Sequence, residues 1–192
     1  MRAWFALTML ALLPILSGCP AAVVGGVAAT AVVVDDRRTT GIYFEDQNIE
    51  MKAAKAIRDK YEKDERVRVA VTSFNRYVLV TGQAPTAEIK ADIGVIVLGT
   101  ENVRNVQNEV TVGSVPSAGQ RSTDGYTTSK VKTKLVTDGK DKVSANHVKV
   151  VTEDNVVYLM GLVDRKEADA ATEIARTTGG VTKVVRVFEL LN

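Results

Sequence analysis

Cys19 is the only cysteine of the 192-residue chain, and it lies where a thiol could be modified chemically. A basic residue, Arg2, and an apolar stretch over residues 3–15 precede it, as in a secretory signal segment. Residues 16–19 read Leu-Ser-Gly-Cys, the pattern of a lipobox, in which small side chains precede a thiol that a transferase can alkylate with diacylglycerol. This spacing predicts that residues 1–18 are a lipoprotein signal peptide and that Cys19 becomes the lipid anchor.

Two alternatives to a lipid anchor remain open: an ordinary signal peptide followed by an unimportant cysteine, and an uncleaved anchor. The apolar stretch is shorter than the roughly 20 residues that a helix needs to span a bilayer. Resemblance to bacterial lipoproteins also bears on sorting, because Pro20 replaces the aspartate typical of inner-membrane retention. We therefore expect an outer-membrane, lipid-anchored protein with its body in the periplasm, and no internal disulfide.

Few other residues could do chemistry. His147 is the only histidine, and the Gly25-Gly26 pair lacks the lysine and hydroxyl residue of a phosphate loop. Asp64-Glu65 is typical of a solvated turn, and carboxylates do not cluster at metal-ligand spacing. Basic and acidic residues nearly balance, at 25 and 23, which argues against nucleic-acid binding. We expect no enzyme activity, no metal, no cofactor and no small-molecule substrate.

The chain carries periodic patterns from about residue 47 onward. Asn48 can cap a helix whose apolar residues recur at helical spacing. Alternating valines over residues 67–71 and 78–80 then predict a hairpin that turns at Asn75-Arg76 and ends at Gly82. The stretch therefore begins with a helix and two antiparallel strands.

A second helix and a third strand complete this first pattern. Thr86 can cap a helix that runs through Leu98 and stops at Gly99. Valines at positions 103, 106, 110 and 112 predict one strand after it. Residues 114–125 are rich in Gly, Ser and Pro, and this composition predicts a linker.

The same order of elements is repeated after the linker. Its expected helices and strands fall at residues 127–137, 147–151, 157–161, 164–180 and 181–187. Asp164 followed by Glu167 is a capping-box arrangement. Positions such as Val69, Gly82 and Glu88 correspond to Val148, Gly161 and Glu167 at a constant offset of 79 residues. We interpret this as an internal duplication.

The predicted fold class is α+β, with two α-β-β-α-β units. In each unit a helical crossover of about 20 residues suits a return to a parallel strand. Each unit is then a mixed three-stranded sheet packed against two helices on one face. Because such a unit is small, we expect the two copies to pack together.

These residues resemble the BON domain. The second copy carries the pattern most clearly, in Val148-x-Val150, Val157-x-Leu159-x-Gly161 and Gly180-Val181-x-x-Val184, while the first has Arg76 where a glycine is common. With the lipobox and an Asp-Arg-Arg-Thr-Thr-Gly segment, the chain resembles the dual-BON outer-membrane lipoproteins. We assign residues 19–46 to the lipidated N-terminus and linker, 47–113 to the first BON domain and 126–192 to the second.

The resemblance implies a function at the membrane. It implies phospholipid binding, support of cell-envelope integrity, localisation at division sites and a link to outer-membrane protein assembly machinery. It also places contact with anionic phospholipid on the first helix of the second domain. On that helix, Thr128, Val131 and Leu135 should face the sheet at 100° per residue. The predicted phospholipid-binding residues on the outer side are Tyr126, Lys130, Thr133, Lys134 and Val136.

The positive charge on and after the predicted lipid-binding helix supports the prediction that it binds anionic phospholipid. The segment from Tyr126 to Lys149 contains six lysines and only two aspartates, and Lys140, Lys142 and Lys149 add to the positive patch. A solvated helix face with routine lysines is the alternative. A protein-interaction adaptor that uses the first domain around Met51, Lys55 and Arg58 is the competing function, and the two functions are compatible.

Overall fold

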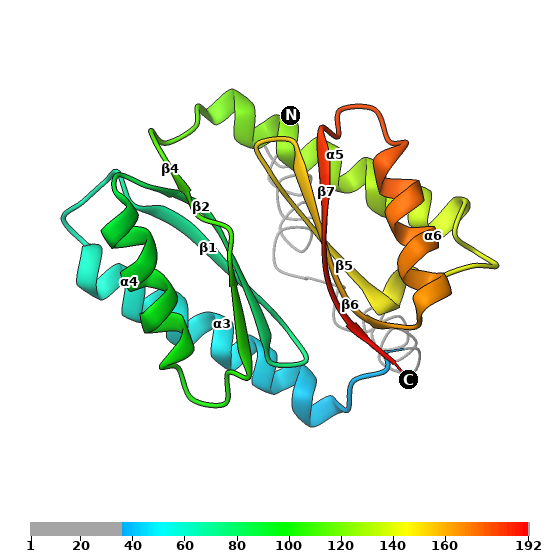
Figure 1. Cartoon of the computed structure of the whole chain (residues 1–192), viewed down its shortest axis with the longest axis horizontal. Helices are drawn as coiled ribbons and strands as arrows, with labels where there is room; N and C mark the ends of the chain where they lie inside the picture. Colours follow the sequence, from blue (N-terminus) through cyan, green and yellow to red (C-terminus); the bar gives the residue numbers. More distant parts are fainter. Residues whose placement is uncertain (1–35, 192) are drawn as a thin grey trace, which may run out of the picture. The chain divides into compact units, whose positions relative to one another are not determined.

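The computed structural model describes residues 36–191 (Figure 1). The predicted signal peptide, the lipid-anchor residue Cys19 and the apolar segment 20–34 lie outside the described residues. Residues 36–192 form one compact unit. Among the described residues, no helix is long and apolar enough to cross a membrane.

The described chain contains two copies of one motif, here called the first unit and the second unit. The elements of the first unit are α3 (Thr40–Tyr61), β1 (Arg68–Phe74), β2 (Tyr77–Ala84), α4 (Ala87–Leu98), β3 (Asn105–Asn108) and β4 (Thr111–Val112). The elements of the second unit are α5 (Ala118–Thr137), the 3-10 turn η2 (Ala145–His147), β5 (Val148–Glu153), β6 (Val156–Val163), α6 (Arg165–Arg176) and β7 (Lys183–Leu190). The α-β-β-α-β order and the α+β class are confirmed.

Each unit has a mixed sheet with its second strand in the middle. In the first unit β1 pairs antiparallel with β2, and β3 and β4 pair parallel with β2. In the second unit β5 pairs antiparallel with β6, and β7 pairs parallel with β6. The helical crossover to a parallel third strand is therefore confirmed in both units.

The third strand of the first unit is broken, and the prediction of one continuous strand is wrong there. Val103 lies in the turn before β3, and Val110 lies between β3 and β4. The side chain of Asn108 donates to Lys90 O at 2.7 Å and accepts from Val110 N at 3.3 Å. This side chain competes with the ladder for backbone groups at the break.

The first helix of each unit begins earlier than the sequence pattern predicts. Thr39 caps α3 by accepting from Ile42 N, so the expected cap at Asn48 is wrong. Ser117 caps α5 in the same way, so the last eight residues of the predicted linker 114–125 are helical. Low apolar content hid these first turns, because propensity and capping alone carry them.

The duplication is visible in the register of the two units, although its offset is not constant. The hairpins are 79 residues apart, since Val69 pairs with Gly82 as Val148 pairs with Gly161. The caps of the second helices, Thr86 and Asp164, are 78 residues apart. The first unit has one more residue before that helix, so Glu88 does not correspond to Glu167, and Ile89 does.

Helices cover one face of each sheet and form its core. In the first unit Ile49, Ala53 and Ile57 of α3 pack with Ile93 and Val97 of α4 against β2. The core of the second unit is the same arrangement, built from Val131, Leu135, Val157, Leu159, Ala171 and Ala175. Aliphatic side chains at helical and alternating spacing account for both cores.

The opposite faces of the two sheets also contribute to a shared cluster. Phe74 and Leu79 of the first unit lie in one buried group with Tyr158 and Met160 of the second. Burial raises the pKa of Tyr158 to about 12, with the charges of nearby carboxylates adding to the effect. The central strands are thus buried on both faces, which explains their uninterrupted apolar runs. The expectation that the two copies pack together is met by this cluster.

Candidate membrane-binding face

Helix α5 carries the predicted lipid-binding residues on its outer side. Its buried residues are Asp124, Thr127, Val131 and Leu135. Thr127 occupies the buried position expected for Thr128, which is half-buried and donates to Thr152 Oγ1 at 2.8 Å. The earlier start of the helix does not change the side on which the predicted residues lie.

Tyr126 is the most prominent apolar group of this face, with 66% of the residue exposed. Lys130 lies one turn further along α5, and its ammonium nitrogen is 4.8 Å from the centroid of the Tyr126 ring. This is cation–π distance and holds the aromatic ring beside the positive charge. An exposed tyrosine with an adjacent lysine suits the boundary between headgroups and water.

Two lysines of this face are held by the carbonyl groups that follow α6. Lys130 Nζ donates to Gly179 O, and Lys134 Nζ donates to Thr177 O at 3.4 Å. An ammonium group has three donors, so each lysine retains donors for a ligand. These carbonyl groups lie just beyond the negative end of the α6 dipole, which the positive lysines complement.

The turn after α6 brings its backbone close to α5 through a glycine. Gly180 has φ +100°, and a Cβ there would lie 3.2 Å from both Lys130 Nζ and Thr127 Oγ1. Glycine supplies this conformation without strain and leaves the room in which the lysine lies. The Gly179-Gly180 pair therefore does more than end the helix, because it also positions Lys130.

A shallow hollow of about 380 Å³ lies between α5 and this turn. Most of its lining surface is apolar, in contrast to the charges at its edge. Its lining residues are Tyr126, Ser129, Lys130, Thr133, Lys134, Thr178 and Gly179. Four of the five predicted lipid-binding residues thus line one hollow.

Val136 and Lys149 lie apart from that hollow. Val136 is 61% exposed on α5, but it does not line the hollow. Lys149, which was counted with the positive patch, instead donates to Glu50 Oε1 at 2.7 Å and to Ser73 O at 3.3 Å, both in the first unit. Its inclusion in the patch is wrong, because β5 directs it toward the first unit.

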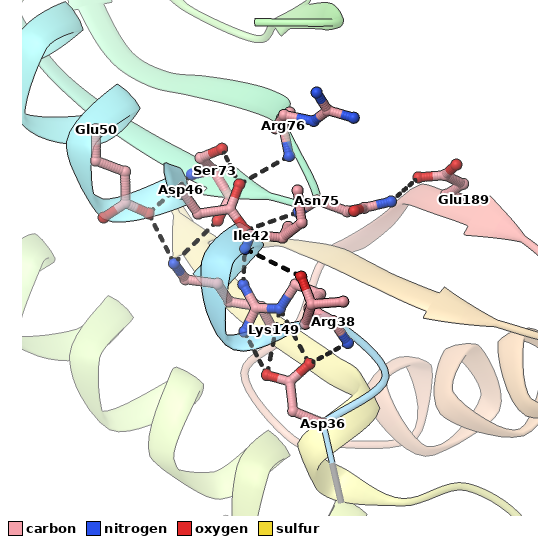
Figure 2. A network of polar contacts seen from close by, with 11 residues as sticks. Asp36, Arg38, Ile42, Asp46, Glu50, Ser73, Asn75, Arg76, Lys149 and Glu189 are labelled. Carbon is pink, nitrogen blue, oxygen red and sulfur yellow. Dashed lines mark hydrogen bonds and ion pairs between the residues drawn. The ribbon is translucent and has the colours of Figure 1, made fainter. Parts of the chain in front are cut away.

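A second polar site, missed in the sequence, surrounds Asp46 of α3 (Figure 2). Asp46 is 2% exposed and accepts hydrogen bonds from Ser73 Oγ at 2.6 Å, Asn75 N at 2.8 Å and Arg76 N at 2.7 Å. It also pairs with Arg38 at 2.8 Å. Asp46 lay in the predicted linker 19–46, just before the predicted helix, and no further signal in the sequence marked the site.

Arg38 is buried against the same site. Only 8% of its side chain is exposed, and its guanidinium lies 3.9 Å from the centroid of the Phe74 ring. Burial alone lowers the pKa of Arg38, but hydrogen bonds to Asp36 and Asp46 outweigh it, and the pKa is raised. The arginine is therefore a fixed positive charge.

Arg37, the preceding residue, contacts the second unit. Its guanidinium donates to Leu162 O at 2.9 Å and to both carboxylate oxygens of Glu167, at 2.6 and 2.9 Å. Burial raises the pKa of Glu167, but hydrogen bonds from Arg37, the Asp164 amide and His147 lower it overall. His147 Nδ1 is 3.3 Å from the same carboxylate. His147 is the last residue of the 3-10 turn η2, so the prediction that it opens the strand is wrong. Within residues 36–191, no group of His, Cys, Asp and Glu could hold a metal ion.

Comparison with known proteins agrees with the duplicated fold. The model of the BON domain family matches residues 45–114 and 123–192. The chain is 40% identical over 181 residues to outer membrane lipoprotein DolP of Haemophilus influenzae, which covers 92% of this chain and 91% of that protein.

Two further relatives are more distant. The 21 kDa hemolysin of Actinobacillus pleuropneumoniae is 35% identical over 153 residues, or 80% of this chain and 78% of that protein. Osmotically-inducible protein Y of Escherichia coli is 31% identical over 150 residues, or 75% of this chain and 72% of that protein. The similarity thus extends over most of the described residues in each case.

Proposed function

This chain belongs to the BON-domain family and is an outer-membrane lipoprotein of the DolP type, and from that premise we propose that its second unit binds anionic phospholipid. Cys19 carries the lipid anchor in this proposal, with palmitate among its acyl chains. The body faces the periplasm, where it supports outer-membrane integrity at division sites. The function is binding without catalysis.

The observation that carries the proposal is the pair of fixed lysines beside an exposed tyrosine. Carbonyl groups at the end of α6 hold Lys130 and Lys134, so little side-chain entropy is lost when a phosphate approaches them. A lysine near an anionic surface contributes about 1 kcal/mol. Tyr126 and the apolar hollow add a place for the glycerol region of a lipid.

A contact of this strength is weak by itself, and the anchor makes it effective. Lipid on Cys19 already confines the body to a membrane, so the second contact acts at high effective concentration. Tyr126 and its lysines would then select the region of membrane rather than supply adhesion. An anionic, curved region such as a division site is a suitable target for a positively charged face.

Vesicle co-sedimentation tests the proposal. Residues 36–192 form a compact unit, so they can be measured without the anchor. We expect Tyr126→Glu to lower binding to phosphatidylglycerol vesicles at least tenfold with the melting temperature unchanged. We expect Lys130→Glu, which also loses the bond to Gly179 O, to lower this binding at least tenfold as well. Lys132→Glu, on another side of α5, is the charge-matched control and should retain most of the binding. Equal binding by all four proteins would contradict the proposal.

A second candidate function is contact with outer-membrane protein assembly machinery through the first unit. Val95 and Leu98 of α4 are 68% and 58% exposed, and Met51 of α3 is 64% exposed. Of the other residues predicted for this role, Lys55 pairs with Asp59 of its own helix, and Arg58 lines a hollow near the linker. Exposed aliphatic side chains on a surface helix favour a protein partner.

Site-specific crosslinking separates the two functions. A photoreactive residue at Val95 should capture a protein in the envelope, whereas one at Tyr126 should capture lipid. Protein crosslinks from Val95 without vesicle binding by residues 36–192 would favour the adaptor alone. Vesicle binding without protein crosslinks from Val95 would favour the lipid function alone.

A further inference from the structure

Two adjacent arginines at the entry to the described chain bind different units. Arg37 binds the second unit at Leu162 O and Glu167, and Arg38 binds the first unit at Asp46 and the Phe74 ring. Neighbouring Cα atoms are only about 3.8 Å apart. The attachment points in the two units are therefore linked by a single peptide bond.

Each attachment is more than a surface ion pair. Arg37 contacts both oxygens of Glu167, which is the bidentate geometry that gives guanidinium–carboxylate pairs their strength. Glu167 is itself fixed, because it is the third residue of α6 and accepts from Asp164 N at 2.8 Å in the capping box. Arg37 is thus bound to the first turn of α6, which the capping box holds in place.

The attachment in the first unit is equally rigid. Asp46 binds Arg38 together with the backbone amides of the β1–β2 turn, so the arginine is tied to both α3 and the hairpin (Figure 2). Asp36 holds the other side of the guanidinium at 2.6 Å. Thr39 then starts α3 directly, which leaves no flexible residue between the arginine and the helix.

The described residues also form other polar contacts between the units. They are Lys149 with Glu50 at 2.7 Å and with Ser73 O at 3.3 Å, Asn75 with Glu189 at 2.6 Å, Arg104 with Glu189 at 3.3 Å and Gln83 with Glu153 at 2.9 Å. The two ion pairs among them are partly exposed, and exposed ion pairs contribute little free energy. The shared apolar cluster supplies attraction that has no preferred direction, whereas the hydrogen bonds of the two arginines are directional.

We propose that Asp36–Thr39 is a strap that holds the two units in one relative orientation. The strap meets α6 at its first turn, and the lysines of α5 meet the carbonyl groups that follow its last turn. A helix of 12 residues is about 18 Å long. Arg37 and the lysine face thus lie at opposite ends of one rigid helix. The orientation does not depend on lipid binding; only its use at a membrane rests on the proposed function.

Distance measurement between the units tests the strap. Nitroxide labels on Ala91→Cys of α4 and Glu173→Cys of α6, both exposed positions, report the orientation in the full chain with Cys19→Ser. We expect one narrow distance distribution, which Arg37→Ala broadens at least twofold. Arg186→Ala removes an exposed arginine pair of the same unit and should leave the distribution narrow.

A second variant excludes general loss of folding as the cause. Two glycines inserted between Arg37 and Arg38 keep both side chains and lengthen only the link. We expect this variant to broaden the distribution with its melting temperature within two degrees of the parent. A distribution that stays narrow in either Arg37→Ala or the insertion variant would overturn the proposal, whatever the vesicle binding.

Discussion

The second helices of the two units, α4 and α6, pack in equivalent positions, but the outer surface of α4 is apolar where that of α6 is charged. Both α4 and α6 are 12 residues long, and the buried Ile93 and Val97 of α4 correspond to the buried Ala171 and Ala175 of α6. Where α6 places the ion pair of Glu173 and Arg176, α4 places Val95 and Leu98, both more than half exposed. The inner face was retained after duplication because the core needs it, while the outer faces became free to serve different surfaces.

The first helices of the two units, in contrast, share a polar feature: a buried aspartate that binds the backbone amides of the hairpin turn. Asp124 of α5 is 5% exposed and accepts from the Asp154 and Asn155 amides at 3.0 and 2.9 Å, as Asp46 does from the first hairpin. The turn residues have positive φ, at 53° and 65° in the first unit and 49° and 60° in the second. A carboxylate under the turn stabilises it without the usual glycine.

The two aspartates should differ in strength, and this is the largest effect that we predict. Asp46→Ala leaves the buried Arg38 with Asp36 alone and also removes the hydrogen bonds from Ser73 and the turn amides, which together costs about 3–5 kcal/mol of unfolding free energy. Asp124→Ala removes three hydrogen bonds, from the Asp154 and Asn155 amides and the Gln120 side chain, for a loss of about 2 kcal/mol. Urea unfolding measures both. Equal losses would mean that Arg38 adds nothing to the first site.

A second test concerns the glycines that end the equivalent hairpins. A Cβ on Gly82 would lie 2.1 Å from Arg68 O, and one on Gly161 would lie 2.3 Å from His147 O. Gly82 also has φ +113°, so we expect Gly82→Ala to cost about 3 kcal/mol and Gly161→Ala about 2 kcal/mol. Thermal unfolding checks the order. Gly113→Ala, which meets no atom within 4 Å, is the control and should change nothing.

The sequence was sufficient to predict the two hairpins, the duplication and the fold class, although not the break between β3 and β4. Alternating valines on both sides of a turn, such as Val69 and Val78, leave little choice of structure. Tyr126, Lys130 and Lys134 were also placed on the correct side of α5, since helical spacing fixes direction. The first turns of α3 and α5 were missed because they have no apolar periodicity, and only Thr39 and Ser117 mark them.

Long-range partners could not be predicted from local pattern. Lys149 has the same type and spacing as a patch lysine, and only the packing of the units gives it Glu50 as a partner. Arg38 and Asp46 both fell in the predicted linker 19–46, and their burial could not be predicted because burial is a tertiary property. The uninterrupted run from Val157 to Met160 did carry a signal, since burial on both faces removes the alternation.

Acid should lower the stability of the second unit through Glu167, whose counterpart in the first unit is Ile89, which cannot ionise. Glu167 has a lowered pKa, so its stabilisation is present above its unfolded value of 4.5 and is lost as the pH falls through the folded value. At pH 7 we expect Glu167→Gln to cost about 1–2 kcal/mol, and this difference should shrink below pH 4.5. Ile89→Gln, at the equivalent helix position, should cost the same at every pH. Urea unfolding of both variants at pH 7 and pH 3 measures whether the loss of unfolding free energy depends on pH only for Glu167→Gln.

We expect the smallest effect on stability from a variant that makes the apolar outer surface of α4 charged. Val95→Glu with Leu98→Arg gives α4 the ion pair of α6, and because both positions are exposed, the unfolding free energy should change by less than about 0.5 kcal/mol. If the outer face of α4 serves a protein partner, this double variant loses crosslinks from neighbouring Ala91 and retains vesicle binding. The reverse exchange, Glu173→Val with Arg176→Leu, should not create such crosslinks on α6, because a partner surface requires more than two apolar side chains. Crosslinks that survive on α4 would mean that its apolar surface diverged without a function.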